Sequence, residues 1–189
     1  MRIIAGERGG AQLYAPRGMD TRPTQDKVKE SLFSIIHAYV PGARVLDLFA
    51  GSGALALEAL SRGADRAALA DRDREAAACI RRNVEKLRFA ERARLYAADW
   101  RQAVSQMQAE GRRFDLVFLD PPYASGLLQQ ALTDIAAFDI CRAHGIIIAE
   151  SAVDTVLPEM PAPYALYREY RYGKIKLTVY HRGGNEDTE

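Results

Sequence analysis

The chain has 189 residues, of which 48% are hydrophobic and 27% are charged, and its formal net charge is +1. These values are typical of one globular domain that is long enough to bury a core. The sequence has no secretory signal and no apolar run near 18 residues, and its two cysteines fit neither disulfide nor metal spacing. We therefore expect a cytoplasmic protein without a membrane segment or a metal site.

The first 40 residues predict a small appendage made of a β-hairpin and a helix. Residues 2–6 and 11–15 are short strand-like runs joined by a turn at 7–10. Thr24 is a suitable N-cap for the helix that follows, whose apolar stripe runs from Val28 to Ile36 before Pro41-Gly42 ends it. We assign residues 1–40 to this appendage and residues 41–182 to the main domain. The acidic tail, 183–189, is expected to be disordered.

Strands and helices alternate through the main domain. Strands are predicted at 45–49, 66–70, 93–97, 114–119 and 145–149. Helices are predicted between Ser52, as N-cap, and Gly63, as C-terminal stop, and at 74–87, 101–109 and 127–138. Residues 164–170 and 174–180 predict a closing antiparallel hairpin. This order indicates an α/β fold with a Rossmann-like, doubly wound, mostly parallel seven-stranded sheet.

The turn after the strand at 45–49 is the first candidate ligand site. Gly51 and Gly53 permit positive φ and close approach of a ligand, which in such folds lies beyond the carboxyl ends of the strands. The spacing Gly51-x-Gly53-x-x-Ala56, with Asp71 about twenty residues on, also fits a dinucleotide fingerprint. Asp47 distinguishes the two, because a carboxylate would repel a pyrophosphate. It either bonds amides of the turn or faces a cationic ligand.

A second candidate site is Asp120-Pro121-Pro122-Tyr123, directly after the strand at 114–119. Two prolines remove two amide donors, so the segment offers a carboxylate and carbonyl oxygens. Such acceptors suit an exocyclic amine, and Tyr123 offers a face for stacking a base, worth about 1–3 kcal/mol. The alternative is a rigid loop in which the tyrosine fills a gap.

These two motifs together resemble class I methyltransferases that use S-adenosylmethionine (AdoMet) and modify an amino nitrogen. The stretches at 2–6 and 22–30 narrow the resemblance to the bacterial small-subunit ribosomal RNA guanine-N2 methyltransferase family, along residues 2–182. The resemblance implies direct methyl transfer from AdoMet to the N2 amine of one guanine. It also implies a monomer that acts on small-subunit ribosomal RNA, within an assembling or assembled ribosomal subunit.

The resemblance further implies roles for individual residues. Asp71 would take the ribose hydroxyls, and Asp99 the adenine amine, with Trp100 or Arg72 beside the ring. Asp71 as a surface acid and Trp100 as a core residue are the alternatives. The implied AdoMet site comprises Asp47, Phe49, Gly51, Ser52, Gly53, Asp71, Arg72, Asp99 and Trp100. The target base would meet Asp120, Pro121, Pro122 and Tyr123.

Basic residues gather in two parts of the sequence, residues 1–44 and the closing hairpin, where they are expected to meet RNA phosphates. Lys27 and Lys29 stand where the family has arginines, so they keep the charge and lose bidentate geometry. The candidate RNA contacts are Arg2, Arg22, Thr24, Lys27, Lys29 and Arg171. The arginines of residues 74–92, interspersed with acids, are expected to be plain surface.

Three other functions are weighed against this one. An adenine-N6 methyltransferase would use the same Asp120 motif, but a DNA enzyme would normally need a recognition insertion for which this chain has no room. A methyltransferase-like RNA-binding protein without catalysis is the second, and the intact glycines and Asp120 argue against it. A dehydrogenase is disfavoured by Asp47 and leaves the Asp120 motif unexplained.

Overall fold

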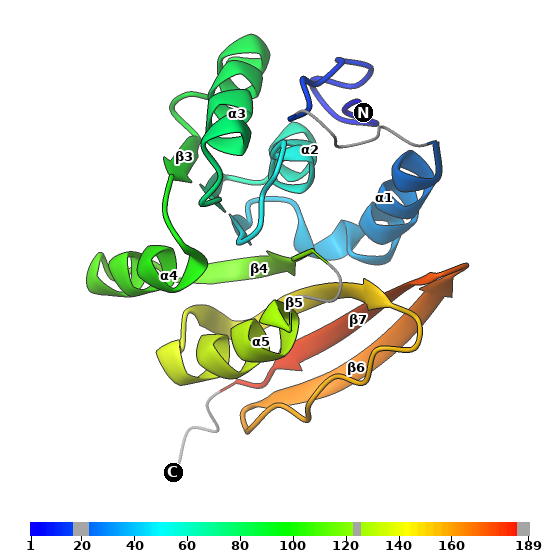
Figure 1. The fold of residues 1–189 in the computed structure, drawn as a ribbon, viewed down its shortest axis with the longest axis vertical. Helices are drawn as coiled ribbons and strands as arrows, with labels where there is room; N and C mark the ends of the chain where they lie inside the picture. Colours follow the sequence, from blue (N-terminus) through cyan, green and yellow to red (C-terminus); the bar gives the residue numbers. More distant parts are fainter. Residues whose placement is uncertain (17–22, 123–125, 185–189) are drawn as a thin grey trace. The chain divides into compact units, whose positions relative to one another are not determined.

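The computed structural model describes residues 1–16, 23–122 and 126–184 (Figure 1). They form two compact units, Met1–Ala103 and Val104–Glu189, which we describe one at a time. The predictions for Arg22, Tyr123 and the end of the tail fall outside the described residues, as does the side chain of Thr24. Within the described ranges, no helix combines the length and the apolar character that crossing a membrane requires.

The sheet of the first unit contains three parallel strands in the order β3-β2-β1. They are β1 (Arg44–Asp47), β2 (Arg66–Ala70) and β3 (Ala93–Tyr96). Leu46 lies opposite Ala68, and Leu69 lies opposite Leu95. Most of β1 and β2 is buried, which is why their sequences are nearly continuous apolar runs. All three parallel strands were predicted within two residues of their ends.

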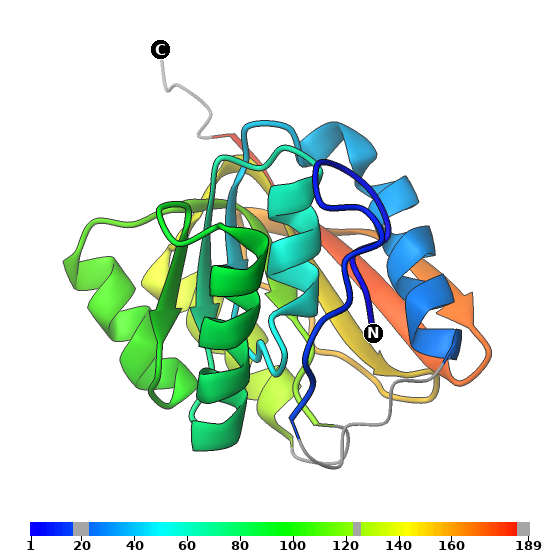
Figure 2. The same cartoon turned by 90° about the horizontal axis from the view of Figure 1, so that it is seen from above.

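Helices α2 (Ala54–Ser61) and α3 (Arg74–Leu87) lie side by side next to this sheet (Figure 2). The N-cap of α2 is Gly53, with φ +80°, so the prediction of Ser52 as N-cap was wrong. Gly63 ends α2 as predicted, because its φ of +101° allows the Ala64 amide to reach the Ala59 carbonyl at 3.0 Å. Helix α4 (Trp100–Ala109) begins at the end of the unit.

The N-terminal segment pairs with itself less than predicted. One antiparallel bridge joins Arg2 and Gln12, in place of two strands. The described part of α1 (Pro23–Ile35) begins at Pro23, so Thr24 lies inside the helix and is not its N-cap. A short 3-10 turn, η1 (His37–Tyr39), follows. The segment gains its order from α2 instead of from a sheet of its own.

The fully buried carboxylate of Glu58, on α2, holds this segment in place. Its two oxygens accept from the amides of Ile4 and Ala5 at 2.7 and 3.0 Å. Lys29 of α1 approaches it at 3.1 Å, and Arg62 donates to it at 2.7 Å. Burial lowers the pKa of Lys29, while the charge of Glu58 opposes that shift. The carboxylate therefore joins the N-terminal segment, α1 and α2.

A second group of bonds lies one turn further along α2. The Ser61 hydroxyl donates to the Ala5 carbonyl at 2.6 Å and accepts from the Arg8 amide at 3.0 Å. Gly6, with φ +85°, passes so close that a Cβ there would lie 1.8 Å from the Ser61 carbonyl oxygen. A glycine is required at this point for steric reasons as well as conformational ones.

The second unit contains four strands in the order β4-β5-β7-β6. They are β4 (Phe114–Leu119), β5 (Cys141–Ala152), β6 (Tyr164–Tyr172) and β7 (Ile175–Arg182), with helix α5 (Leu127–Phe138) between the first two. β4 and β5 are parallel, whereas β7 pairs antiparallel with β5 and with β6. The predicted fold class is confirmed, with seven strands, mostly parallel, and a closing antiparallel hairpin. β5 is longer at both ends than the predicted strand at 145–149.

We expect Glu58→Ala to lower the free energy of unfolding by about 3–5 kcal/mol, because it leaves buried cations without their partner. Urea denaturation measures this loss. Amide hydrogen exchange should also accelerate at Ile4 and Ala5, which lose their acceptor. Glu85→Ala on the exposed face of α3 is the control and should change stability by at most about 0.5 kcal/mol. Equal losses in the two variants would contradict the role given to Glu58.

Candidate functional site

The backbone of the turn after β1 is bonded to the end of β2. The Ala50 amide donates to the Ala70 carbonyl at 3.0 Å, and the Gly51 amide donates to Asp71 Oδ2 at 2.8 Å. Gly51 and Gly53 have φ of +55° and +80°. The turn is therefore held at the carboxyl ends of two neighbouring parallel strands, where ligands of α/β folds bind.

Asn83 of α3 supports the turn from behind, and the sequence analysis missed it. Its side chain is fully buried and donates to the Ser52 carbonyl and to the Tyr14 carbonyl, both at 2.9 Å. The Ser52 hydroxyl is buried as well and contacts Met1 Sδ at 3.1 Å, so it is engaged within the protein. The sequence did contain one signal for this role: Asn83 lies three residues after Ile80, so helical spacing places its polar side chain on the buried face of α3.

Asp47 lies beneath the turn and is 2% exposed. Its Oδ2 accepts from the Ala56 amide at 3.2 Å, which agrees with the alternative that Asp47 bonds backbone amides. Its Oδ1 is buried and has no hydrogen-bond partner among the described residues. Burial raises the pKa of Asp47 to about 7; the Ala56 amide opposes this shift and the charge of Asp71 adds to it. A cationic ligand group would compensate the unpaired oxygen.

The other predicted AdoMet residues also gather at the carboxyl ends of the first unit's strands. Half-buried Asp71 follows β2 and accepts from the Asp73 amide at 2.9 Å. Asp99 precedes α4 and accepts from the Arg101 amide at 3.0 Å. The ring centroids of Phe49 and Trp100 are 6.2 Å apart.

The aromatic and basic members of this set differ in exposure. Trp100 is 5% exposed and lies beneath the Arg101 guanidinium, so the packing interpretation holds for it. Arg72 is exposed at the end of β2, and Phe49 is half-buried. These two side chains are therefore more accessible than that of Trp100.

The charge of this site decides between the two classes of ligand. Of its acidic groups, Asp47 is the last residue of β1, Asp71 follows β2 and Asp99 follows β3. Arg72 is the basic residue predicted there. Acidic groups at this edge of the sheet oppose an anionic pyrophosphate and favour a ligand with an ammonium or sulfonium charge and hydroxyl donors. Among the described residues these carboxylates do not form a group that could hold a metal ion.

The Asp120 motif lies in the second unit, at the carboxyl end of β4. Asp120 is half-buried, Pro121 is buried and Pro122 is exposed. β4 ends at Leu119, so the motif directly follows a strand, as predicted. Tyr123 lies outside the described residues, so its predicted contact with the base stays a prediction.

The predicted RNA contacts divide into exposed and buried side chains. Lys27 and Arg171 are exposed, and Arg2 is more than half exposed, 3.7 Å from Asp26. Lys29 is buried against Glu58 and donates to the Arg2 carbonyl, so the prediction that it meets phosphate was wrong. Helical spacing did not reveal that its partner lies on another helix.

Three further basic residues also have internal partners. Lys176 is 3.0 Å from Glu169, and Arg182 is 2.8 Å from Asp139. Arg92 donates to the Leu60 carbonyl at 3.0 Å and to Glu7 at 2.6 Å, so it is structural and not plain surface. The charge available to RNA is therefore smaller than the sequence suggests.

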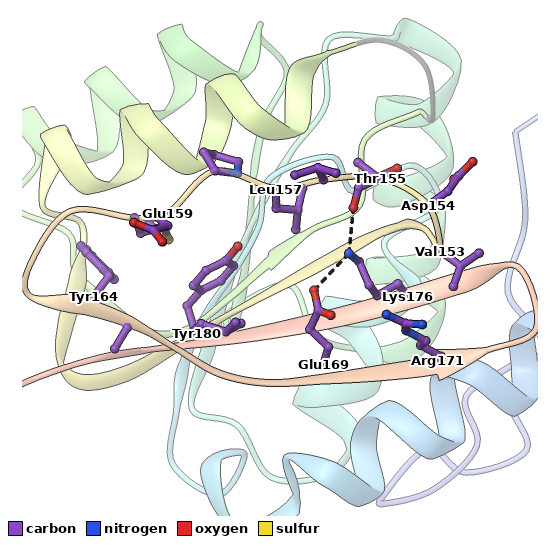
Figure 3. Close-up of a pocket in the computed structure, with 15 residues that line it drawn as sticks. Val153, Asp154, Thr155, Leu157, Glu159, Tyr164, Glu169, Arg171, Lys176 and Tyr180 are labelled. Carbon is purple, nitrogen blue, oxygen red and sulfur yellow. Dashed lines mark hydrogen bonds and ion pairs between the residues drawn. The ribbon is translucent and has the colours of Figure 1, made fainter.

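The second unit also holds a cavity of about 580 Å³ beneath the loop of residues 153–163 (Figure 3). The ammonium of Lys176 fastens this loop by donating to the Thr155 carbonyl at 2.8 Å. The ring of Tyr180 and the side chain of Leu157 line the cavity, and Glu169 and Arg171 lie on its β6 side. Of the predicted site residues in the described ranges, Arg171 alone contributes to this lining.

The fold is that of a Rossmann-like methyltransferase, and a solved structure supports this class. The "Putative methyltransferase yhhF from Escherichia coli" is similar with a TM-score of 0.86 and 32% identity, over 98% of this chain and 99% of that one. The chain belongs to the family described as "Conserved hypothetical protein 95", which it matches over residues 1–181.

Two curated relatives resemble the chain over nearly its whole length. The "Putative rRNA methyltransferase YlbH" of Bacillus subtilis is 39% identical, over 97% of this chain and 100% of the relative. The "Ribosomal RNA small subunit methyltransferase D" of Escherichia coli K12 is 35% identical, over 100% of this chain and 93% of the relative.

The buried Asp47 gives an expected pH dependence of stability. Because its folded pKa of about 7 lies above the unfolded value near 3.8, the folded state binds the extra proton between these values. The wild type should therefore lose up to about 4 kcal/mol relative to Asp47→Asn as pH rises from about 4 to about 7. Urea denaturation of both proteins across this range measures the difference. Parallel curves would contradict an ionisable, desolvated Asp47.

Proposed function

We propose that the protein transfers a methyl group from AdoMet to the exocyclic N2 amine of a guanine in small-subunit ribosomal RNA. The observation that carries this proposal is the acidic strand-end site with its unpaired Asp47 oxygen, which favours a cationic ligand over a dinucleotide. Membership in the family, and the activity named for the Escherichia coli relative, support the reaction and the RNA substrate.

The AdoMet site comprises residues that follow β1, β2 and β3. Asp47 compensates a positive charge, directly or through water, and Asp71 offers a carboxylate to ribose hydroxyls while it holds the Gly51 amide. Asp99 accepts from the adenine amine, with Arg72 and Phe49 beside the ring. When bound, AdoMet supplies an electrophilic methyl group and a neutral thioether leaving group. Gly53 keeps the turn compact, since a Cβ there would lie 2.9 Å from Leu69.

Asp120 and the Pro121 carbonyl hold the amine of the target guanine. Two acceptors fix its two N–H bonds and so aim the nitrogen lone pair, which is the orientation effect that contributes most to such transfers. The nitrogen becomes positive as the N–C bond forms, and Asp120 stabilises that charge. Its carboxylate can then receive the surplus proton, because the alkylated amine is strongly acidic before it loses that proton.

The RNA side of the proposal rests on exposed cations and on the nature of the substrate. Arg2, Lys27 and Arg171 contact phosphates, and residues 1–40 contribute to binding. A guanine that is paired in the substrate must be extruded to reach Asp120. We propose that the protein acts as a monomer on a ribosomal particle.

The deciding experiment measures transfer from radiolabelled AdoMet to small ribosomal subunits prepared from cells that lack this enzyme. Free ribosomal RNA and duplex DNA serve as parallel substrates, and the labelled nucleoside is identified by mass. We expect N2-methylguanosine from the subunits. Methyladenosine would replace the proposed specificity by adenine-N6 methylation. AdoMet binding without label in any substrate would favour the non-catalytic RNA-binding function.

Asp120→Ala should lower the rate of transfer by about 100-fold or more, because the amine loses its carboxylate acceptor. Equilibrium dialysis should show AdoMet affinity within about twofold of the wild type, since the proposed AdoMet contacts lie elsewhere in the sequence.

The matched control is Asp115→Asn on β4, the strand that precedes Asp120; it removes an exposed ion pair with Arg142 at 3.2 Å and should leave transfer unchanged. Loss of AdoMet binding in Asp120→Ala would assign Asp120 to the cofactor site instead of the base.

A further inference from the structure

The two faces of the β6–β7 hairpin differ in chemistry. Leu166, Glu169 and Arg171 of β6 belong to the face that lines the cavity. Residues that alternate with these belong to the opposite face, where strand pairing sets Arg168 beside Val179 and Tyr170 beside Leu177. The residues of this second face are Tyr167, Arg168, Tyr170 and Tyr172 of β6, together with His181 of β7. We call this set the hairpin aromatic face.

A β-bulge creates the centre of the hairpin aromatic face. The register shifts between Leu166 and Arg168, so the extra residue, Tyr167, turns to the same side as Arg168. Tyr167 stacks on His181 with ring centroids 4.3 Å apart and an interplanar angle of 13°. The Arg168 guanidinium lies 5.9 Å from the Tyr167 ring and 6.0 Å from the Tyr170 ring.

Tyr167 and Arg168 are the exposed members of this face, whereas Tyr170, Tyr172 and His181 are half-buried. Tyr167 is 57% exposed, so its ring contributes little to the core. Arg168 is exposed on this side, whereas the neighbouring acid, Glu169, turns to the cavity and pairs with Lys176 at 3.0 Å. The exposed ring of Tyr167 beside the Arg168 guanidinium suits a ligand that is both aromatic and anionic, which is the chemistry of a single-stranded nucleic acid.

We propose that the hairpin aromatic face stacks unpaired bases of the RNA substrate, with Tyr167 as the principal platform and Arg168 on the adjoining phosphate. This inference rests on the proposed function, because it takes RNA as the substrate. Tyrosines on a sheet surface bind single-stranded RNA in this way in other folds, by stacking instead of groove reading. The prior stack on His181 fixes the Tyr167 ring, so less side-chain entropy is lost when a base arrives.

The test compares variants of the whole chain in binding a fluorescein-labelled, unstructured purine-rich RNA, followed by anisotropy. Tyr167→Ala should weaken binding about 5- to 150-fold, the equivalent of one lost base stack of about 1–3 kcal/mol. Tyr167→Phe should bind like the wild type, because it keeps the ring. Leu166→Ala is the matched control: Leu166 is the preceding residue, is 58% exposed and lies on the cavity side, so its affinity should not change.

Salt dependence separates the roles of the two central residues. Tyr167→Ala should leave the slope of log affinity against log salt unchanged, whereas Arg168→Gln should reduce it by about 0.7, the value for one phosphate contact on a single strand. Equal affinities for Tyr167→Ala and Leu166→Ala would overturn the proposal. Unchanged oligonucleotide affinity together with lost transfer to ribosomal subunits would also overturn it and assign the face to a protein.

The methyl-transfer assay, run on the same preparations, keeps this inference distinct from the proposed function. If the wild type methylates guanine and Tyr167→Ala binds RNA as tightly as Tyr167→Phe, the stacking proposal is wrong and the proposed function is retained. If RNA binding depends on the Tyr167 ring but no substrate is methylated, the catalytic function fails and the stacking face stands.

Discussion

A single buried carboxylate, Glu58, determines how the first unit is put together. Burying an unpaired carboxylate is very costly, so its surroundings must supply donors and positive charge. Two amides of the N-terminal segment and the side chains of Lys29 and Arg62 do so. The short N-terminal segment thus acquires a fixed position without forming a regular hairpin. The same arrangement withdraws Lys29 from the surface.

The regular elements were readable from sequence because their signals are local. Strands at 66–70 and 114–119 and helices at 74–87 and 127–138 were predicted to the residue, since apolar runs and flanking turn residues define them. Failures came where distant residues decide. The N-terminal segment forms one bridge in place of two strands, and its amides bond to Glu58. The N-cap of α2 is Gly53 and not Ser52. β5 extends further than predicted because β4 pairs with it from Cys141 and β7 pairs with it as far as Ala152.

The sequence predicted which residues gather at the strand ends of the first unit, but not which contacts each of them makes. Asp47 ends β1, and Asp71 and Asp99 follow β2 and β3, because parallel strands bring successive βα turns to one edge. Whether each side chain meets a ligand or the protein depends on three-dimensional contacts. Trp100 is packed, Ser52 is tied to Met1, and Asp71 is partly used by the turn. Asn83 belongs to no sequence motif, so the sequence analysis did not select it.

The hydrogen bonds of the Asn83 side chain link the turn after β1 to the segment around Tyr14. One side-chain amide joins the Ser52 carbonyl of the turn to the Tyr14 carbonyl, and its oxygen accepts from the Tyr14 amide at 2.8 Å. A ligand that restrained the backbone of the turn would therefore also restrain the segment around Tyr14, because Asn83 is bonded to both. Thermodynamic reciprocity requires the reverse as well. A contact that restrained the N-terminal segment would therefore also favour ligand binding at the turn, which would be cooperativity without any large movement.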